Sequence, residues 1–75
     1  MSCQLLVHLR QAEGALVRLL GLAERRGYAP LSVWADPGGE ETMVVHLTVS
    51  AARPVDLLVR QFDKLYDVKH VETIQ

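Results

Sequence analysis

Between residues 3 and 28 the chain changes its hydrophobic period, and this change limits the folds open to it more than any other feature. Over 3–10, Leu5, Val7 and Leu9 fall on one face by period two, which predicts a strand with one buried face. Over 12–26 the period becomes that of an amphipathic helix. The predicted apolar face of that helix consists of Ala12, Leu16, Leu19, Leu20 and Ala23.

Two glycines delimit this predicted helix, and a third lies inside it. Gly14 stands at its opening, and Gly27 stands where a left-handed C-terminal cap is expected. Gly21 weakens the helix by roughly 1 kcal/mol relative to alanine. A close approach of the helix to the sheet would explain a glycine at that position.

The middle of the chain predicts a pair of strands. They are expected at 29–36 and 42–50, joined by the turn Asp36–Glu41, whose proline and glycines suit a reversal of the chain. Pro30 lacks a backbone N–H and would cost a central strand a hydrogen bond, so the 29–36 strand is expected at an edge of the sheet.

The last third of the chain predicts a second helix and a final strand. Pro54 is expected at the first position of a helix over 54–66. Residues 68–74 are expected to form the last strand. The predicted apolar face of the second helix consists of Val55, Leu58, Val59, Phe62 and Leu65.

The predicted order of elements is therefore βαββαβ. Two right-handed crossovers would place both helices on one face of a four-stranded antiparallel sheet of order 4-1-3-2, an α+β fold of the ferredoxin-like kind. The opposite face has no predicted helix over it, yet it carries Leu6, Trp34 and Val44. An exposed apolar patch of this kind marks a protein contact, expected on this face or along a sheet edge.

Composition excludes several classes of protein. With 75 residues the chain is expected to be a single domain, 1–75, with a modest core that favours a homo-oligomer or a larger partner. A net charge of −1 without a long like-charge run argues against binding nucleic acid by phosphate neutralisation. Aromatic residues make up only 5%, too few for an RNA-binding sheet that stacks bases.

Localisation and redox chemistry follow from what the sequence lacks. Cys3 is the only cysteine, which excludes a disulfide framework and a cysteine-rich zinc site. It is expected to act as a small apolar residue, since no neighbouring base or cation activates it. No signal peptide and no apolar run long enough for a membrane span is recognised, so a cytoplasmic location is expected.

The loop around Gly14 is the candidate binding site. A strand that ends in a glycine and enters a helix presents free backbone N–H groups, which suit a small anion such as an amino-acid carboxylate. Gln11 and Ala12 are poor N-cap residues, so side chains are not expected to occupy those groups. The alternative reading is a glycine that the turn geometry alone requires.

The histidines are a second candidate constellation. His8, His46 and His70 fall on three predicted strands that are neighbours in the sheet. They could bind zinc, or they could make an interface sensitive to pH. The plainer alternative is that they populate a half-exposed face. No metal site is assigned, and no catalytic residue is identified.

Three stretches resemble a known family. They are Glu13-Gly14-Ala15-Leu16-Val17-Arg18 continuing to Arg25-Arg26-Gly27-Tyr28, then Met43 to Val49, and then Val55 to Val71. Together they resemble ACT domains, the small regulatory modules of amino-acid metabolism. The third stretch is similar to the small regulatory subunits of acetolactate synthase (acetohydroxyacid synthase).

This resemblance implies a regulatory role without a catalytic residue or a cofactor in this chain. Such modules dimerise, bind a branched-chain amino acid near the first strand–helix loop, and dock on a thiamine-diphosphate-dependent catalytic subunit. An activating subunit in branched-chain amino-acid biosynthesis is therefore expected, with no nucleic-acid or membrane partner. The ligand loop carried over to this sequence consists of Gln11, Ala12, Glu13, Gly14, Ala15 and Leu16.

The sequence departs from the valine-sensitive members in two ways. Those members begin the loop with an asparagine, whereas this chain has Gln11 and contains no asparagine at all. Acylphosphatases are ferredoxin-like enzymes with a catalytic asparagine, so the absence of asparagine argues against that activity here. Longer members carry a second domain after the ACT module, whereas the sequence here ends at Gln75. The resemblance therefore implies the short form, which is expected to activate without strong valine sensitivity. A stand-alone ACT-type amino-acid sensor of another enzyme or regulator is the alternative function.

Overall fold

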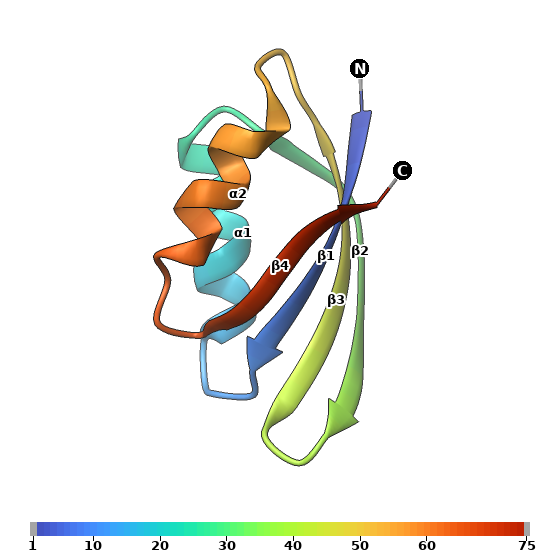
Figure 1. Cartoon of the computed structure of the whole chain (residues 1–75), viewed down its shortest axis with the longest axis vertical. Coiled ribbons are helices and arrows are strands. Elements are labelled where there is room, and N and C mark those ends of the chain that lie inside the picture. The colour runs from blue at the N-terminus through green and yellow to red at the C-terminus, as the bar shows by residue number, and fades with distance from the viewer. Residues whose placement is uncertain (1, 75) are drawn as a thin grey trace.

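Residues 2–74 are described by a computed structural model, in which four strands and two helices follow one another as βαββαβ (Figure 1). The sheet order is β2-β3-β1-β4, with every neighbouring pair antiparallel. Both helices lie on the same face of the sheet (Figure 1). The predicted fold and strand order are therefore confirmed. The elements are β1 (Ser2–Arg10), α1 (Ala15–Arg25), β2 (Ala29–Gly39), β3 (Thr42–Ser50), α2 (Val55–Asp63) and β4 (Val68–Ile74).

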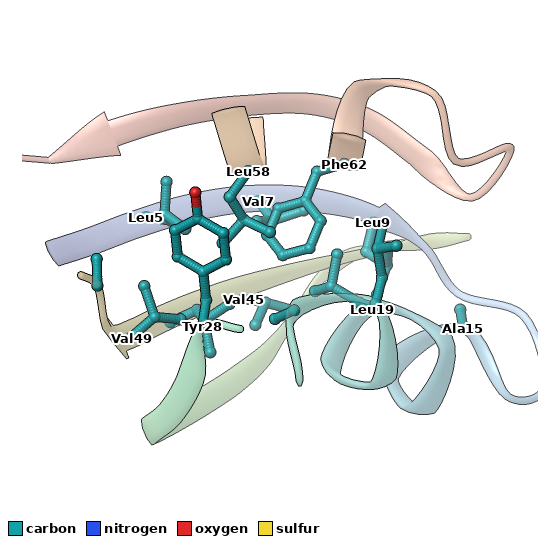
Figure 2. Close-up of a cluster of buried hydrophobic side chains, with 14 residues drawn as sticks. Leu5, Val7, Leu9, Ala15, Leu19, Tyr28, Val45, Val49, Leu58 and Phe62 are labelled. Carbon is teal, nitrogen blue, oxygen red and sulfur yellow. The ribbon is translucent and has the colours of Figure 1, made fainter. Parts of the chain in front are cut away.

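The core lies between the two helices and the two central strands. Leu5, Val7 and Leu9 of β1 are fully buried, as their alternation predicted. Leu58 and Phe62 of α2 pack over them from the helix side (Figure 2). Full burial of each such side chain contributes roughly 1.5–3 kcal/mol. The remaining buried members include Leu19 of α1 and Val45, Leu47 and Val49 of β3.

The first helix differs from its prediction at its start and in its buried face. It begins at Ala15 rather than residue 12, because Gly14 adopts a left-handed conformation (φ 78°) that cannot continue the helix backward. Ala12 therefore lies exposed in the loop. Apolar residues occupy nearly two positions in every turn of this helix. The sequence therefore did not determine which of them face the core. The buried positions are Ala15, Leu19, Leu22 and Ala23, while Leu16 and Leu20 are half-buried.

The end of α1 is closed as predicted. Gly27 has φ 88°, its N–H donates to the carbonyl of Glu24 at 3.0 Å, and the N–H of Tyr28 donates to the carbonyl of Ala23 at 2.9 Å. These two bonds form a Schellman motif, which satisfies the last carbonyls of the helix. Gly21 differs from expectation: a Cβ added there would meet Nη1 of Arg25 at 3.3 Å, so contact with the sheet does not explain it.

The β2–β3 connection is much shorter than predicted. β2 continues to Gly39, and only Glu40 and Glu41 form the turn. The register between the strands shifts between Pro37 and Gly39. A Cβ on Gly38 would lie 2.9 Å from Cγ2 of Val44, so this glycine allows the strands to approach closely. The Pro-Gly-Gly segment is therefore a bulged strand end.

Two further expectations concern β2 and α2. The edge position of β2 is confirmed, with a second register shift between Pro30 and Ser32. Pro54 takes the N-cap position, with ψ 135°, rather than the first helical position. α2 ends at Asp63, three residues before the predicted end, although Leu65 still packs half-buried against the core. No helix within residues 2–74 has the length and apolar character needed to cross a membrane.

Candidate ligand loop between β1 and α1

The loop that joins β1 to α1 presents unoccupied backbone donors. Gly14 is the N-cap of α1, and no side chain caps the helix. The N–H of Ala15 donates to the carbonyl of Ala12 at 3.1 Å, and the N–H of Arg18 donates to the carbonyl of Gly14 at 2.9 Å. Within residues 2–74, the N–H groups of Leu16 and Val17 find no acceptor. The prediction that no side chain would occupy the first donors of this helix is confirmed.

An ion pair braces this end of α1. Nε of Arg18 donates to Oδ2 of Asp67 at 2.8 Å, and Nη2 of Arg18 lies 2.8 Å from the same oxygen. The side chain of Asp67 is 8% exposed and that of Arg18 is 50% exposed, so the carboxylate is the buried partner. The carbonyl of Asp67 also accepts the N–H of Arg10 at 2.6 Å. Asp67 thereby holds α1, β1 and the α2–β4 loop together.

The brace explains part of the requirement for glycine at position 14. A Cβ there would lie 2.8 Å from Nη1 of Arg18, and the φ of 78° is strained for any other residue except asparagine or aspartate. The turn reading of Gly14 therefore has a structural basis. A ligand at this loop remains a prediction.

The predicted ligand residues form one continuous loop, but they do not all offer a side chain. Gln11, Ala12, Glu13 and Gly14 are exposed, and the N–H of Gln11 donates to the carbonyl of Glu41 in the β2–β3 turn at 2.9 Å. The side chain of Ala15 is in the core and is 1% exposed. Leu16 is half-buried. Ala15 could therefore contact a ligand only through its backbone.

Sequence reasoning missed Arg18 and Asp67. Arg18 follows Gly14 by one helical turn, a spacing that places the two residues on the same face of α1. This spacing could have indicated that the Arg18 side chain lies beside Gly14. Asp67 is distant in sequence, and only the docking of the α2–β4 loop brings it to Arg18.

Two hollows on the described surface are lined by residues outside this loop. One lies on the open face of the sheet and is lined by Gln4, Ser32, Trp34, His46 and Thr48. The other lies beside α2 and is lined in part by Arg26, Arg53 and Arg60.

The open face carries the predicted patch in a modified form. Trp34 is 69% exposed and pairs across the sheet with His46, which in turn pairs with Leu6. Val44 lies in the next row, opposite Asp36. His46 thus separates Trp34 from Leu6, and the patch mixes apolar and polar side chains.

Two of the three histidines lie together. His8 and His70 pair across β1 and β4, with ring centroids 5.5 Å apart and an interplanar angle of 66°. Nε2 of His70 lies 2.8 Å from Oε1 of Glu72. His46 lies one row further along the sheet, opposite Leu6. Over residues 2–74 the structure contains no group of three histidine, cysteine or acidic side chains arranged to hold a metal ion.

The chain combines a βαββαβ fold with a glycine at the first strand–helix junction. Sequence comparison assigns this combination to a known family. The sequence model described as "ACT domain" matches residues 11–71. The chain belongs to the ACT domain family.

Within curated proteins, the chain is similar to the acetolactate synthase isozyme 2 small subunit of Escherichia coli K12. The two are 36% identical over 76 aligned residues, which cover 100% of this chain and 87% of the relative. The subunit of the same name from Shigella flexneri matches to the same extent.

Solved structures show the same fold at low sequence identity. The ACT domain of the GTP pyrophosphokinase from Chlorobium tepidum superposes with a TM-score of 0.82 at 10% identity, covering 99% of this chain and 97% of that one. The C-terminal domain of MgtC from Mycobacterium tuberculosis superposes with a TM-score of 0.74 at 14% identity, covering 97% of this chain and 84% of that one.

Proposed function

We propose that this chain is a regulatory small subunit of an acetolactate synthase, which docks on the catalytic subunit and activates it. The observation that carries the proposal is the similarity to the isozyme 2 small subunit, because it extends over 100% of this chain. A second copy and the catalytic subunit are the proposed partners. The activation is a linkage effect, in which the small subunit binds the competent conformation of the catalytic subunit more tightly than other conformations.

The open face of the sheet supports such docking. Within residues 2–74 no helix covers it, and Trp34 exposes 69% of its surface there. Tryptophan is enriched among the residues that contribute most to binding at protein interfaces. Trp34 is therefore the proposed anchor for a partner, whether the catalytic subunit or a second copy of this chain.

The loop at Gly14 is the proposed site for a branched-chain amino acid. The carboxylate would accept hydrogen bonds from the free N–H groups of Leu16 and Val17, where the helix dipole also favours negative charge. The exposed position of Gln11 to Gly14 leaves the ligand's apolar side chain without a pocket in one copy. A second copy packed against this loop would supply that cover.

Acetolactate formation tests the proposal directly. The catalytic subunit of the same organism is assayed alone and with an excess of this chain, and stimulation of the rate is expected. Trp34→Ala is the test variant for docking, and Leu31→Ala, another exposed apolar residue of β2 (60% exposed), is its control. No stimulation together with no complex in sedimentation would reject the subunit assignment and leave a separate amino-acid sensor.

Calorimetry with valine tests the ligand loop separately. Gly14→Asp should weaken valine binding by placing a carboxylate beside the proposed carboxylate site. Gly27→Asp is the matched control, because Gly27 also has a positive φ but lies at the other end of α1. An equal valine affinity in both variants would remove the loop from the binding site.

A further inference from the structure

Cationic side chains gather around the hollow beside α2. This hollow has a volume of about 340 Å³ and is lined by Arg26, Arg53, Arg60 and Lys64, together with Tyr28 and Leu57. The whole chain has eight lysine and arginine residues and a net charge of −1, so half of its cations line one hollow. We call it the cationic hollow.

The geometry of α2 produces this concentration. Leu57, Arg60 and the C-cap residue Lys64 follow one another at intervals of three or four residues, which places them along one side of α2. Arg53 lies just before the helix, next to its N-cap Pro54. The core-facing side of α2 is occupied by Leu58 and Phe62. The cationic stripe therefore runs along the side of α2 that remains outside the core.

A second element completes the hollow. Arg26 follows the last turn of α1, and α1 and α2 pack on the same face of the sheet (Figure 1). The Tyr28 ring is 2% exposed, and its hydroxyl donates to the carbonyl of Pro54 at 2.8 Å. This bond ties the residue before β2 to the start of α2, so the wall of the hollow between the cationic side chains is held in place.

The charges in the cationic hollow are not neutralised by the protein. Within residues 2–74, no carboxylate lies within 4.0 Å of Arg26, Arg53, Arg60 or Lys64. Arg18 makes the contrast, since its guanidinium pairs with Asp67 at 2.8 Å. Like charges held close together repel one another, and an anion bound between them relieves that repulsion.

We propose that the cationic hollow binds a small molecule carrying two or more phosphoryl groups. Guanidinium groups form paired hydrogen bonds with phosphate oxygens, and several of them around one hollow match several phosphoryl charges. A hollow of about 340 Å³ is large enough to hold a small molecule of this kind. Leu57, which is 44% exposed, provides an apolar wall for the organic part of such a molecule. This site is separate from the amino-acid loop and does not depend on the proposed function.

Calorimetry of the intact chain with two probes tests the site. Inorganic tripolyphosphate supplies the phosphoryl charge alone, and ADP adds an organic part. Arg60→Gln removes a cation that lines the hollow. Arg25→Gln is the matched control, because it removes an exposed arginine from a helix end without removing a lining residue. Loss of a charge-assisted hydrogen bond should weaken tripolyphosphate binding about tenfold or more in Arg60→Gln.

The expected result is saturable binding of at least one probe, weakened by Arg60→Gln and changed less than about twofold by Arg25→Gln. The tighter of the two probes identifies the source of the phosphoryl groups, inorganic or nucleotide. Three results would overturn the proposal: no saturable binding of either probe, equal losses in the two variants, or equally tight binding of an octaglutamate peptide. The last two would indicate a diffuse positive field instead of a phosphoryl site.

Discussion

The two ends of α1 differ in which groups, side chain or backbone, are left without a partner in residues 2–74. At the N-terminal end the guanidinium of Arg18 pairs with Asp67, while the backbone N–H groups of Leu16 and Val17 find no acceptor within residues 2–74. At the C-terminal end the Schellman bonds satisfy the backbone, while Arg26 faces a hollow with other unpaired cations. A ligand at the first end would be recognised by main chain, and a ligand at the second end by side chains.

This difference has a consequence for how each site tolerates sequence change. A main-chain site depends on the conformation of Gly14, so most substitutions nearby change little unless they alter the backbone. A side-chain site depends on which residues line it, so single substitutions change its affinity without disturbing the fold. The following variants test this contrast, from the largest expected effect to the smallest.

Phe62→Ala should weaken both ends together. Phe62 is fully buried between the helices and the sheet, and truncation of a core aromatic costs about 3–5 kcal/mol in the free energy of unfolding. Chemical denaturation measures the loss. A loss below about 1 kcal/mol would mean that α2 is not anchored through this residue.

Asp67→Ala should destabilise the N-terminal end specifically. Removing one partner of a fully buried ion pair costs about 3–5 kcal/mol, but Arg18 is half exposed and water can solvate it, so about 1–2 kcal/mol is expected here. Asp63→Ala is the control, since Asp63 is an exposed aspartate and should change stability by less than about 0.5 kcal/mol. Equal effects in the two variants would rule out the brace.

Gly14→Ala should cost somewhat more than Gly27→Ala. Both residues have a positive φ, and alanine in that conformation costs roughly 1–2 kcal/mol. A Cβ at Gly27 meets nothing within 4 Å, whereas one at Gly14 displaces the end of the Arg18 side chain. Thermal unfolding of the two variants gives the difference, and a larger loss at Gly27 would contradict it.

Arg53→Gln should leave stability unchanged or raise it by up to about 0.5 kcal/mol. Arg53 precedes the N-terminus of α2, where the helix dipole disfavours a cation, and it lies beside three other cations. The gain should shrink as salt screens the charges. Denaturation at low and high ionic strength measures both effects, and a clear loss of stability would show that Arg53 has a stabilising partner.

Much of the fold followed from short-range patterns in the sequence. The alternation of Leu5, Val7 and Leu9 identified a buried strand face, and Gly27 identified a helix end, because each signal depends only on neighbouring residues. Signals that depend on the partner element were less informative. Pro37, Gly38 and Gly39 have the composition of a turn, but pairing with β3 keeps them in a bulged strand.

The candidate sites show the same limit. The free donors near Gly14 could be anticipated from the poor capping residues before it. The Arg18–Asp67 brace could not, because it joins residues separated by 49 positions. The cationic hollow could not be predicted either, because Arg26 is distant in sequence from Arg60 and Lys64 and only the packing of α1 beside α2 brings them together.

β2 is the long edge strand of the sheet, and its length affects how readily a strand of another chain can pair with it. β2 is exposed along almost all of its length, and an open edge of that kind is a template for further strands. Its regular part is bounded by the register shifts after Pro30 and after Pro37, two residues that cannot donate a backbone hydrogen bond. The edge therefore admits a short partner strand between Ser32 and Pro37, and it resists the continuous stacking by which long, regular edges aggregate.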